Sequence, residues 1–287
     1  MGVVRIEDDW VLCADRPELA GEFDLWDQLR EEAETAAIKE PILGSFYHAA
    51  VLNHDSFACA LSFLLANKLD SQVLPSMLLR DVAMEILESD PSVCHAAQVD
   101  AVAMFQRDPA CPDHLTPFLY YKGYHALQAY RIANRLWRAD RRDLARFIQN
   151  EVSAKLGVDI HPAARIGCGL LLDHATGIVI GETAVIEDDV SILHSVTLGG
   201  TGKEGGDRHP KIRRGVLLSA GCKIIGNIVV GEGAKVGAGS VVLRDVPPRV
   251  TVAGVPAREV GPASSNLPAY DMDHSLGESP EHPFFQT

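Results

Sequence analysis

Three histidines in the second half of the chain carry side chains suited to acid–base chemistry: His174, His194 and His209. Two carboxylates lie near His174 in the sequence, Asp173 directly before it and Asp159 fifteen residues earlier. A carboxylate behind an imidazole fixes the tautomer of the ring and stabilises its protonated form, which is what a general base needs. The sequence therefore predicts that His174 removes a proton and that Asp159 orients it, although any one histidine alone could be an ordinary surface residue.

Basic residues gather in a segment that includes His209. The whole chain has 26 basic and 39 acidic residues and a net charge of −13. Between positions 203 and 235, however, the basic residues outnumber the acidic ones seven to three: Lys203, Arg208, Lys211, Arg213, Arg214, Lys223 and Lys235 against Glu204, Asp207 and Glu232. A basic strip on an acidic protein indicates a specific anionic ligand, such as a phosphorylated cofactor. A solvated face would fit the same count.

The elements that must position these side chains repeat every six residues. An aliphatic residue recurs at this spacing, with two interruptions: Ile160, Ile166, Leu172, Ile180, Ile186, Ile192, Leu198, Ile212, Leu218, Ile224, Val230, Val236 and Val242. A period of six fits neither an α-helix nor an alternating strand. Six successive hits from position 212, in a chain that is 47% hydrophobic, have a chance probability of roughly 1%. The repeat predicts a parallel β-helix in which three hexads make one coil and the aliphatic residues fill the core.

The two interruptions indicate where this β-helix departs from regularity. Eight residues separate Leu172 from Ile180, and fourteen separate Leu198 from Ile212. The longer interval, residues 199–210, is rich in glycine and cannot form a core strand. We expect it to be a loop that protrudes from the β-helix, where functional sites are often found.

The first half of the chain has a helical pattern. We expect helices over residues 22–40, 41–54, 56–70, 74–89 and 92–107, then a loop over 108–117 and a long helical stretch over 118–156 with a kink at Gly123. The predicted organisation is a flexible lead (1–21), an α-helical domain (22–157), a left-handed parallel β-helix (158–260) and a flexible tail (261–287). The fold class is therefore α + β.

Composition and charge exclude several classes of protein. The net negative charge argues against nucleic-acid and anionic-membrane binding, and no apolar run is long enough to span a bilayer. The first ten residues, MGVVRIEDDW, are acidic where a signal peptide would have a basic start and an apolar stretch. The six cysteines form no CxxC pair, which predicts reduced thiols. We therefore expect a cytoplasmic protein.

Several motifs in the two halves resemble serine O-acetyltransferase, a family of hexapeptide-repeat acyltransferases. They are DIHPAA from Asp159, LDHATGI from Leu172, GETAVI from Gly181, SVTLGGTGK from Ser195, DRHPKI from Asp207, AGVPAR from Ala253, RDPA from Arg107 and YHALQAYR from Tyr124. The resemblance covers roughly residues 22–275. Hexapeptide repeats alone would indicate only an acyltransferase, whereas the LDHATG and GDRHP motifs together are far more specific.

The resemblance implies acetyl transfer from acetyl-CoA to the hydroxyl of L-serine, the first step of cysteine synthesis. His174 would take the hydroxyl proton, since a serine hydroxyl is a poor nucleophile without a base. By the family pattern Asp108, Asp173, Arg208 and His209 line the serine site. Carboxylates would pair the ammonium of serine, and Arg208 would hold its carboxylate. CoA would lie along the outside of the coils near Gly200, Ala220, Lys235, Ala238 and Arg258.

The resemblance also implies partners. Members of the family form trimers through the β-helix, with active sites between subunits, and pair the trimers into hexamers through the helical domain. L-Cysteine is an expected inhibitor because it shares the ammonium and carboxylate of serine. Bacterial relatives often end in an isoleucine that binds cysteine synthase, whereas this chain ends Phe284-Phe285-Gln286-Thr287. A complex with cysteine synthase is therefore doubtful.

Three alternatives remain open at this stage. A β-helix of this kind can hold zinc between subunits, but such sites use closely spaced histidines, and His174, His194 and His209 contain no HxxxxH pair. The chain could instead be a scaffold that has lost its chemistry, which the candidate base and its carboxylates argue against. A third possibility is another acceptor such as homoserine or a sugar, because one methylene changes discrimination by only about 1–3 kcal/mol.

Overall fold

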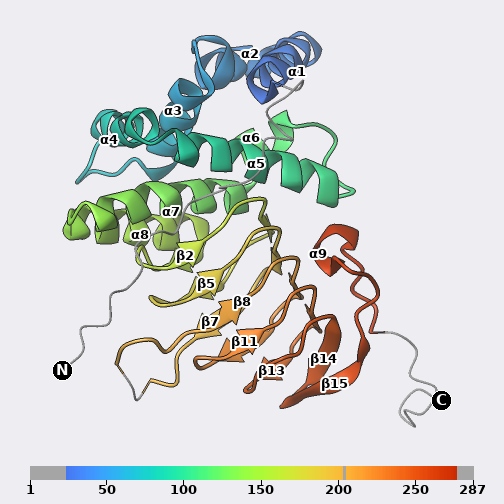
Figure 1. Ribbon diagram of the computed structural model, residues 1–287. Coiled ribbons are helices and arrows are strands. Elements are labelled where there is room, and N and C mark those ends of the chain that lie inside the picture. Colours follow the sequence, from blue (N-terminus) through green and yellow to red (C-terminus); the bar gives the residue numbers. More distant parts are fainter. Residues whose placement is uncertain (1–23, 203–204, 277–287) are drawn as a thin grey trace.

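The protein consists of a helical half packed on one end of a three-sided stack of short strands (Figure 1). The structure is a computed structural model that describes residues 24–202 and 205–276. The last helix of the first half ends at Leu156 and the first strand begins at Val158. Gly157 between them has a φ of 69°, the left-handed conformation that commonly ends a helix. The lead expected at 1–21 lies outside the described residues.

The helical half contains eight α-helices among the described residues, with a 3₁₀ turn and a π turn on either side of α2. Their first turns use side-chain caps where the chain supplies them, since Asp24, Ser56 and Asp90 each accept a backbone N–H. The bounds are α1 (Leu25–Lys39), η2 (Pro41–Leu43), α2 (Gly44–Tyr47), η3 (His48–Leu52), α3 (Phe57–Leu69), α4 (Ser76–Ser89), α5 (Pro91–Arg107), α6 (Leu115–Tyr120), α7 (Lys122–Arg138) and α8 (Arg142–Leu156).

The long helical stretch expected over 118–156 is three separate elements. The end of α6, all of α7 and all of α8 share this stretch, with breaks at Tyr121 and at residues 139–141. The kink expected at Gly123 is also wrong, because Gly123 lies in the first turn of α7 and meets the first coil of the strand stack. A hydrophobic pattern cannot tell one long helix from two antiparallel ones joined by a short turn.

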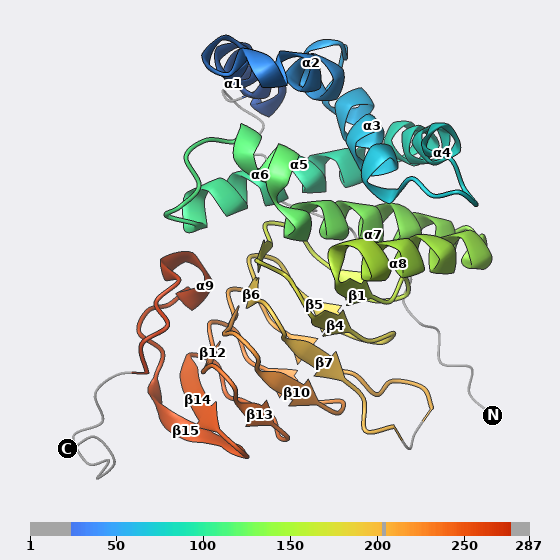
Figure 2. The ribbon, with the colours of Figure 1, turned by 180° about the vertical axis from the view of Figure 1, so that it is seen from behind.

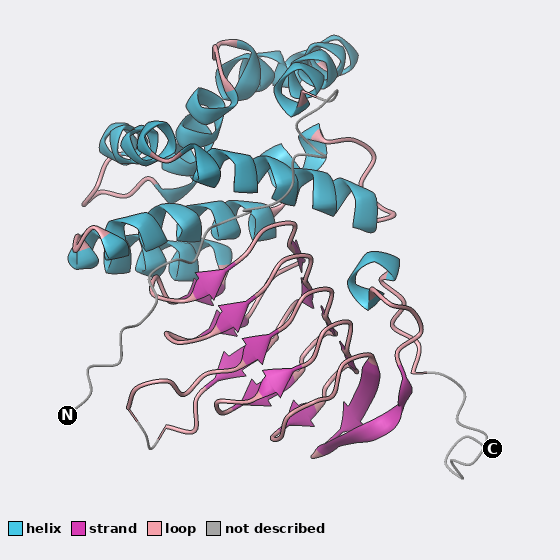
Figure 3. Ribbon diagram, viewed as in Figure 1, coloured by secondary structure: helices cyan, strands magenta, loops and turns pink. Residues whose placement is uncertain are grey.

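The second half is a left-handed parallel β-helix, as the hexads predict (Figure 3). Its three sheets are sheet A (β1-β4-β7-β10-β13), sheet B (β2-β5-β8-β11) and sheet C (β3-β6-β9-β12-β14-β15), and one coil contributes one strand to each. The strands are β1 (Val158–Ile160), β2 (Arg165–Ile166), β3 (Leu171–Asp173), β4 (Ile178–Ile180), β5 (Val185–Ile186), β6 (Ser191–Leu193), β7 (Thr197–Gly199), β8 (Lys211–Ile212), β9 (Leu217–Leu218), β10 (Lys223–Ile225), β11 (Val229–Val230), β12 (Lys235–Val236), β13 (Val241–Val242), β14 (Val250–Gly254) and β15 (Ala257–Pro262).

The pairing register explains both interruptions of the hexads. Val179 lies opposite Thr197, a regular coil of eighteen residues. Val158 lies opposite Ile178, so the first coil is two residues longer, and Thr197 lies opposite Lys223, so the third coil is eight longer. Every hexad aliphatic residue is at most 3% exposed, because it points into the prism.

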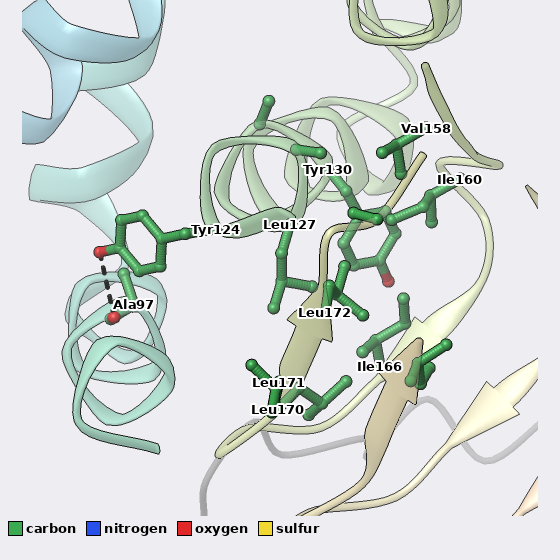
Figure 4. Packing of buried hydrophobic residues seen from close by; sticks show 14 of the residues in the cluster. Ala97, Tyr124, Leu127, Tyr130, Val158, Ile160, Ile166, Leu170, Leu171 and Leu172 are labelled. Carbon is green, nitrogen blue, oxygen red and sulfur yellow. Dashed lines mark hydrogen bonds between the residues drawn. The ribbon is translucent and has the colours of Figure 1, made fainter. Parts of the chain in front are cut away.

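Helix α7 covers the open end of the β-helix (Figure 2; Figure 4). The first coil has no preceding coil to pair with, so its backbone groups need other partners. Tyr130 and Asn134 donate to the carbonyl of Ala164 at 2.5 and 3.1 Å, and Asn134 also donates to Pro162 at 2.7 Å. Arg131 donates to the carbonyl of Gly167 at 2.7 Å. Side chains of one helix thus replace the missing neighbouring strands.

A buried ion pair fixes α7 and α5 to this end. Arg131 Nη2 lies 2.6 Å from Asp100 Oδ2, and both side chains are almost fully buried. Gln128 donates to the same carboxylate oxygen at 3.0 Å, while the backbone N–H of Leu170 donates to Asp100 Oδ1 at 3.0 Å. Burial raises the pKa of Asp100, and the guanidinium of Arg131 opposes that rise. The pair therefore connects two helices with the first coil.

The C-terminal segment packs on the molecule beyond the point where a flexible tail was expected. Strand β15 runs antiparallel to β14 and ends at Pro262, and α9 (Pro268–Asp271) follows. Tyr270 donates to Asp189 Oδ1 at 2.8 Å, and Arg107 lies over its ring at 4.0 Å. The flexible tail expected over 261–287 is therefore wrong for residues 261–276, and residues 277–287, which include the chain end, lie outside the described residues.

The cysteines follow the expectation only in part. Cys59, Cys94, Cys111 and Cys222 are free thiols. Cys168 is disulfide-bonded, so the expectation of reduced thiols is wrong for this residue. No helix in the described part of the chain combines the length and apolar character that crossing a membrane requires. The cytoplasmic location stays a prediction.

Replacing Arg131 by Met would leave the buried carboxylate of Asp100 without its cationic partner. Removing one partner of a buried pair costs about 3–5 kcal/mol, because the remaining charge is uncompensated. We expect the Arg131→Met variant to lose about that much free energy of unfolding in urea titrations at one protein concentration. Arg141→Met is the matched control, because its partner Glu85 is 62% exposed and such pairs contribute about 0–1 kcal/mol. Equal losses in the two variants would contradict this assignment.

Candidate active site

The predicted site residues occupy two different edges of the triangular prism. The edge where sheet C passes into sheet A contains the turns 174–177, 194–196, 219–222 and 237–240. The edge where sheet A passes into sheet B contains the turns 161–164 and 181–184 and the described residues of the long loop, 200–202 and 205–210. His174, His194, Ala220 and Ala238 lie on the C–A edge, whereas Arg208 and His209 lie on the A–B edge. Sheet A separates the two groups within one chain.

His174 lies in an exposed turn directly after β3. Its side chain is 78% exposed, and its Nε2 lies 3.8 Å from Asp173 Oδ1, which is longer than a hydrogen bond. The ring of His194 lies one coil further along, with its centroid 6.3 Å from that of His174 and an interplanar angle of 64°. The C–A edge therefore presents two accessible imidazoles side by side.

Asp159 is not in hydrogen-bond contact with His174 in this chain. It lies on β1, opposite Val179 of β4, and its Oδ1 accepts a hydrogen bond from Gln149 of α8 at 2.7 Å. Among the described residues, Asp173 is the carboxylate within 4 Å of the His174 ring. The orientation of His174 by Asp159 therefore stays a prediction.

His209 is held in a small pocket on the A–B edge. Its Nδ1 lies 2.8 Å from Thr183 Oγ1 and accepts from the backbone N–H of Thr183 at 3.1 Å. The ring lies over Gly181 so closely that a Cβ there would fall 2.0 Å from its Nε2. Burial lowers the pKa of His209, and the neighbouring cation Arg208 lowers it further. A neutral ring in a fixed tautomer can recognise a polar ligand group.

Arg208 is partly engaged by its own chain. Its Nη2 lies 2.6 Å from Glu182 Oε2, and its Nη1 donates to the carbonyl of Gly206 at 3.1 Å. The hydrogen bond from Arg208 lowers the pKa of Glu182. Thr183 Oγ1 accepts the backbone N–H groups of both Arg208 and His209, at 3.0 and 3.2 Å. The end of the long loop is thus anchored on the turn of the preceding coil.

Asp108 lies where α5 ends, and Asp173 lies at the end of β3. Asp108 accepts the hydroxyl of Tyr121 at 2.7 Å and the backbone N–H of Ala110 at 2.8 Å. Tyr121 directly precedes α7, whose first turn packs on the turn that contains His174. Asp108 and Asp173 are therefore both connected to the C–A edge beside His174.

The residues predicted to bind CoA do not all lie on the same edge of the prism. Ala220 and Ala238 are stacked on the C–A edge, because Gly239 N donates to the carbonyl of Ala220 at 2.8 Å, and Gly221 N donates to that of His194 at 2.9 Å. Gly200 starts the long loop, and Arg258 is exposed on β15.

The side chain of Lys235 is less accessible than its predicted place beside CoA requires. Its side chain is 1% exposed, and its ammonium donates to the carbonyl of Ser275 and lies 3.9 Å from Asp273. Burial lowers the pKa of this lysine. In this chain the C-terminal segment therefore covers Lys235, which was predicted to lie near CoA.

Comparison with known proteins agrees with this architecture. Residues 25–129 match the family "Serine acetyltransferase, N-terminal", and residues 209–244 match "Bacterial transferase hexapeptide (six repeats)". The serine acetyltransferase of Escherichia coli strain K12 is 59% identical over 249 residues, which cover 87% of this chain and 91% of that protein. The crystal structure of serine acetyltransferase from Vibrio cholerae O1 biovar El Tor has a TM-score of 0.86 at 60% identity and covers 87% of this chain and 97% of that one.

The chain belongs to the serine acetyltransferase family. It is therefore an acyltransferase. A serine acetyltransferase in complex with cysteine has a TM-score of 0.86 at 53% identity and covers 87% of this chain and 97% of its own. A soybean serine acetyltransferase complexed with serine has a TM-score of 0.80 at 56% identity, covering 82% and 97%. A Brucella abortus serine acetyltransferase in complex with coenzyme A has a TM-score of 0.83 at 51% identity, covering 84% and 97%.

The structure of this serine acetyltransferase family member adds site residues that the sequence did not single out. Glu182 and Thr183 hold Arg208 and His209 from the turn of the preceding coil. His161 lies one coil earlier on the same edge, where burial lowers its pKa and the nearby Glu182 carboxylate opposes that shift. The hexad register could have found all three, because residues one coil apart stack on one edge. No group of three metal-ligating side chains suited to an ion occurs within residues 24–202 and 205–276.

Replacing Gly181 by Ala should push the His209 ring out of its pocket without unfolding the protein. The added Cβ would overlap the far end of a side chain, which can move, rather than backbone. Because burial lowers the pKa of His209, a ring moved into solvent should titrate closer to the ordinary value of about 6.5. NMR of histidine-labelled protein checks this, with His209→Gln to assign the signal. Gly205→Ala, whose Cβ meets nothing within 4 Å, should leave the titration unchanged; a Gly181→Ala profile identical to wild type would contradict the pocket.

Proposed function

We propose that this chain transfers the acetyl group of acetyl-CoA to the hydroxyl of L-serine, giving O-acetyl-L-serine and CoA, in the cytoplasmic synthesis of cysteine. The observation that carries the proposal is the C–A edge. An accessible imidazole, His174, lies there on the same edge as the small residues Ala220 and Ala238. Relatives whose structures hold serine or coenzyme A, at 56% and 51% identity, support the choice of substrates.

His174 acts as the general base in this proposal. Its Nε2 takes the proton from the serine hydroxyl while the hydroxyl oxygen attacks the thioester carbon. A tetrahedral oxyanion forms, and it collapses with cleavage of the carbon–sulfur bond. The CoA thiolate leaves and can receive the proton from the His174 imidazolium. Thiolates are good leaving groups, so the main demand on the protein is to activate and place the hydroxyl.

Asp159 is proposed to orient the ring of His174. Gln149 donates to its Oδ1, which leaves Oδ2 for an imidazole N–H. The assignment requires the His174 ring to turn from its present position, and its 78% exposure leaves room for that movement. The donors that stabilise the oxyanion are most simply backbone N–H groups of the glycine-rich loop.

The amino-acid substrate is proposed to bind between subunits. Asp108 and Asp173, beside His174, pair its ammonium, while Arg208 and His209 bind its carboxylate. Because these two groups lie on opposite sides of sheet A, one chain alone does not bring them together. A trimer in which the C–A edge of one β-helix meets the A–B edge of the next would complete three equal sites. Pairing of two trimers through the helical halves would give the proposed hexamer.

Further partners follow from the same site. CoA is proposed to run along the C–A edge past Ala220 and Ala238, with Gly200, Lys235 and Arg258 also near it. Contact with Lys235 requires the segment Asp273–Ser275 to move, since it now covers that lysine. L-Cysteine has the ammonium and carboxylate of serine, so it should compete for the same groups.

Release of CoA thiol from acetyl-CoA tests the reaction, with L-serine, L-homoserine or no acceptor. We expect turnover that depends on serine and falls by about 10²–10⁴-fold in a folded His174→Ala variant, the usual contribution of a general base. His194→Ala is the matched control on the same edge and should retain most activity. Turnover with homoserine alone would overturn the substrate. Full activity of His174→Ala would overturn the base.

Mixed oligomers test the position of the site between subunits. His174→Ala and His209→Ala chains should each have little activity as separate oligomers. When co-expressed in equal amounts, some interfaces receive an intact His174 from one chain and an intact His209 from its neighbour. Random mixing at a head-to-tail interface gives about a quarter of wild-type activity. Mixed oligomers as inactive as the parents would place both groups in one chain.

A further inference from the structure

The turn that carries His174 has a backbone conformation that needs support. His174 and Ala175 have φ values of 53° and 58°, in the left-handed region. For residues other than glycine this conformation costs about 1–2 kcal/mol each, and two in succession are rarer still. Such a turn persists only where its surroundings hold it. The supporting contacts therefore decide where the imidazole of His174 lies.

The first turn of α7 packs directly against this turn. A Cβ at Gly123 would lie 2.1 Å from the carbonyl oxygen of Leu172 and 3.1 Å from the Cβ of Ala175. Only glycine allows the helix to come so near. Ala175 is completely buried as a result, which holds one side of the turn.

Lys122, one residue earlier, holds the other side. Its Nζ donates a hydrogen bond to Oγ1 of Thr176. The N–H of Thr176 in turn donates to the carbonyl of His174 at 2.8 Å, and its carbonyl accepts the N–H of Ser195 at 2.7 Å. Lys122 is thus connected through one residue to the peptide of His174 and to the next turn of the same edge.

The same helix start also holds a residue of the proposed serine site. Tyr121 directly precedes Lys122, and its hydroxyl donates to Asp108 Oδ2 at 2.7 Å. Tyr121 therefore holds the carboxylate of Asp108, and the next residue, Lys122, holds the turn of His174. The start of α7 sets how far the ammonium site lies from the base.

We propose that Lys122 is a positioning residue for His174, acting through Thr176. This inference rests on the proposed role of His174 as general base. The Lys122–Thr176 hydrogen bond lies at the exposed surface, so its removal should change global stability little. It should instead change how well the base is placed, and displacement by about 1 Å can cost about 10²-fold in rate.

Kinetics of four single variants and one double variant test the proposal in the full-length enzyme. Lys122→Met should lower kcat about tenfold or more, with KM for serine and acetyl-CoA and the thermal midpoint close to wild type. Lys122→Arg, which keeps a donor, should restore most of kcat. Thr176→Val should lower kcat to a similar degree and add little further loss to Lys122→Met in a double-mutant cycle. Lys155→Met is the control, because Lys155 also donates from a helix to a distant group, but to the carbonyl of Asp70 and not to a residue of the turn.

A readout that does not depend on activity separates this inference from the proposed function. The methyl group of Ala175 reports the turn, and NMR of methyl-labelled alanine detects it, with Ala175→Gly to assign the signal. Its resonance should move in Lys122→Met and not in Lys155→Met. If the wild type fails to acetylate serine, the proposed function fails, and this resonance still decides whether Lys122 holds the turn. An unmoved resonance, unchanged kcat in Lys122→Met, or additive losses in the cycle would each overturn the inference.

Discussion

The open end of the β-helix imposes the constraint that organises this molecule. Backbone groups of a first coil have no earlier coil to bond with, and leaving them buried and unpaired is costly. Helix α7 meets this need with polar side chains, from Tyr130 to Asn134, aimed at the carbonyls of the first coil. Asp100 provides the complementary acceptor for an N–H of that coil and holds Arg131 in place.

The helical half therefore supports both the β-helix and the candidate active site. The helix that closes the β-helix also begins beside the turn of His174 and touches it through Gly123. Its residues are buried on nearly all sides, because it lies between the coil below and the other helices above (Figure 4). An element fixed so firmly is a rigid support for a catalytic group, and it connects the stability of the fold with the geometry of the site.

The sequence predicted the repeating part of the fold and the residue types of the site. It predicted less well which side chains the site residues contact. A hexad aliphatic residue has one possible environment, the prism core, so Ile180 or Val236 could be placed from spacing alone. Lys235 could not, because its cover comes from Ser275, forty residues later, through a contact that no periodicity encodes. Asp159 was expected near His174 because it lies about one coil away. The register places it opposite Val179, and Gln149 of α8, outside the repeat, bonds to its carboxylate.

Both ends of the β-helix carry elements that do not belong to the hexad repeat, α7 at the first coil and β15 at the last. A bare last coil would offer unpaired N–H and C=O groups to the strands of another chain, a common route to aggregation. Strand β15 folds back antiparallel on β14 and ends at Pro262, which has no N–H to donate. Pro247 and Pro248 lie within the last coil, between β13 and β14, and Pro248 packs against Gly231. The fold-back of β15 and these prolines make the last coil a poor template for a strand of a second molecule, which favours lateral contact between prisms as the route to assembly.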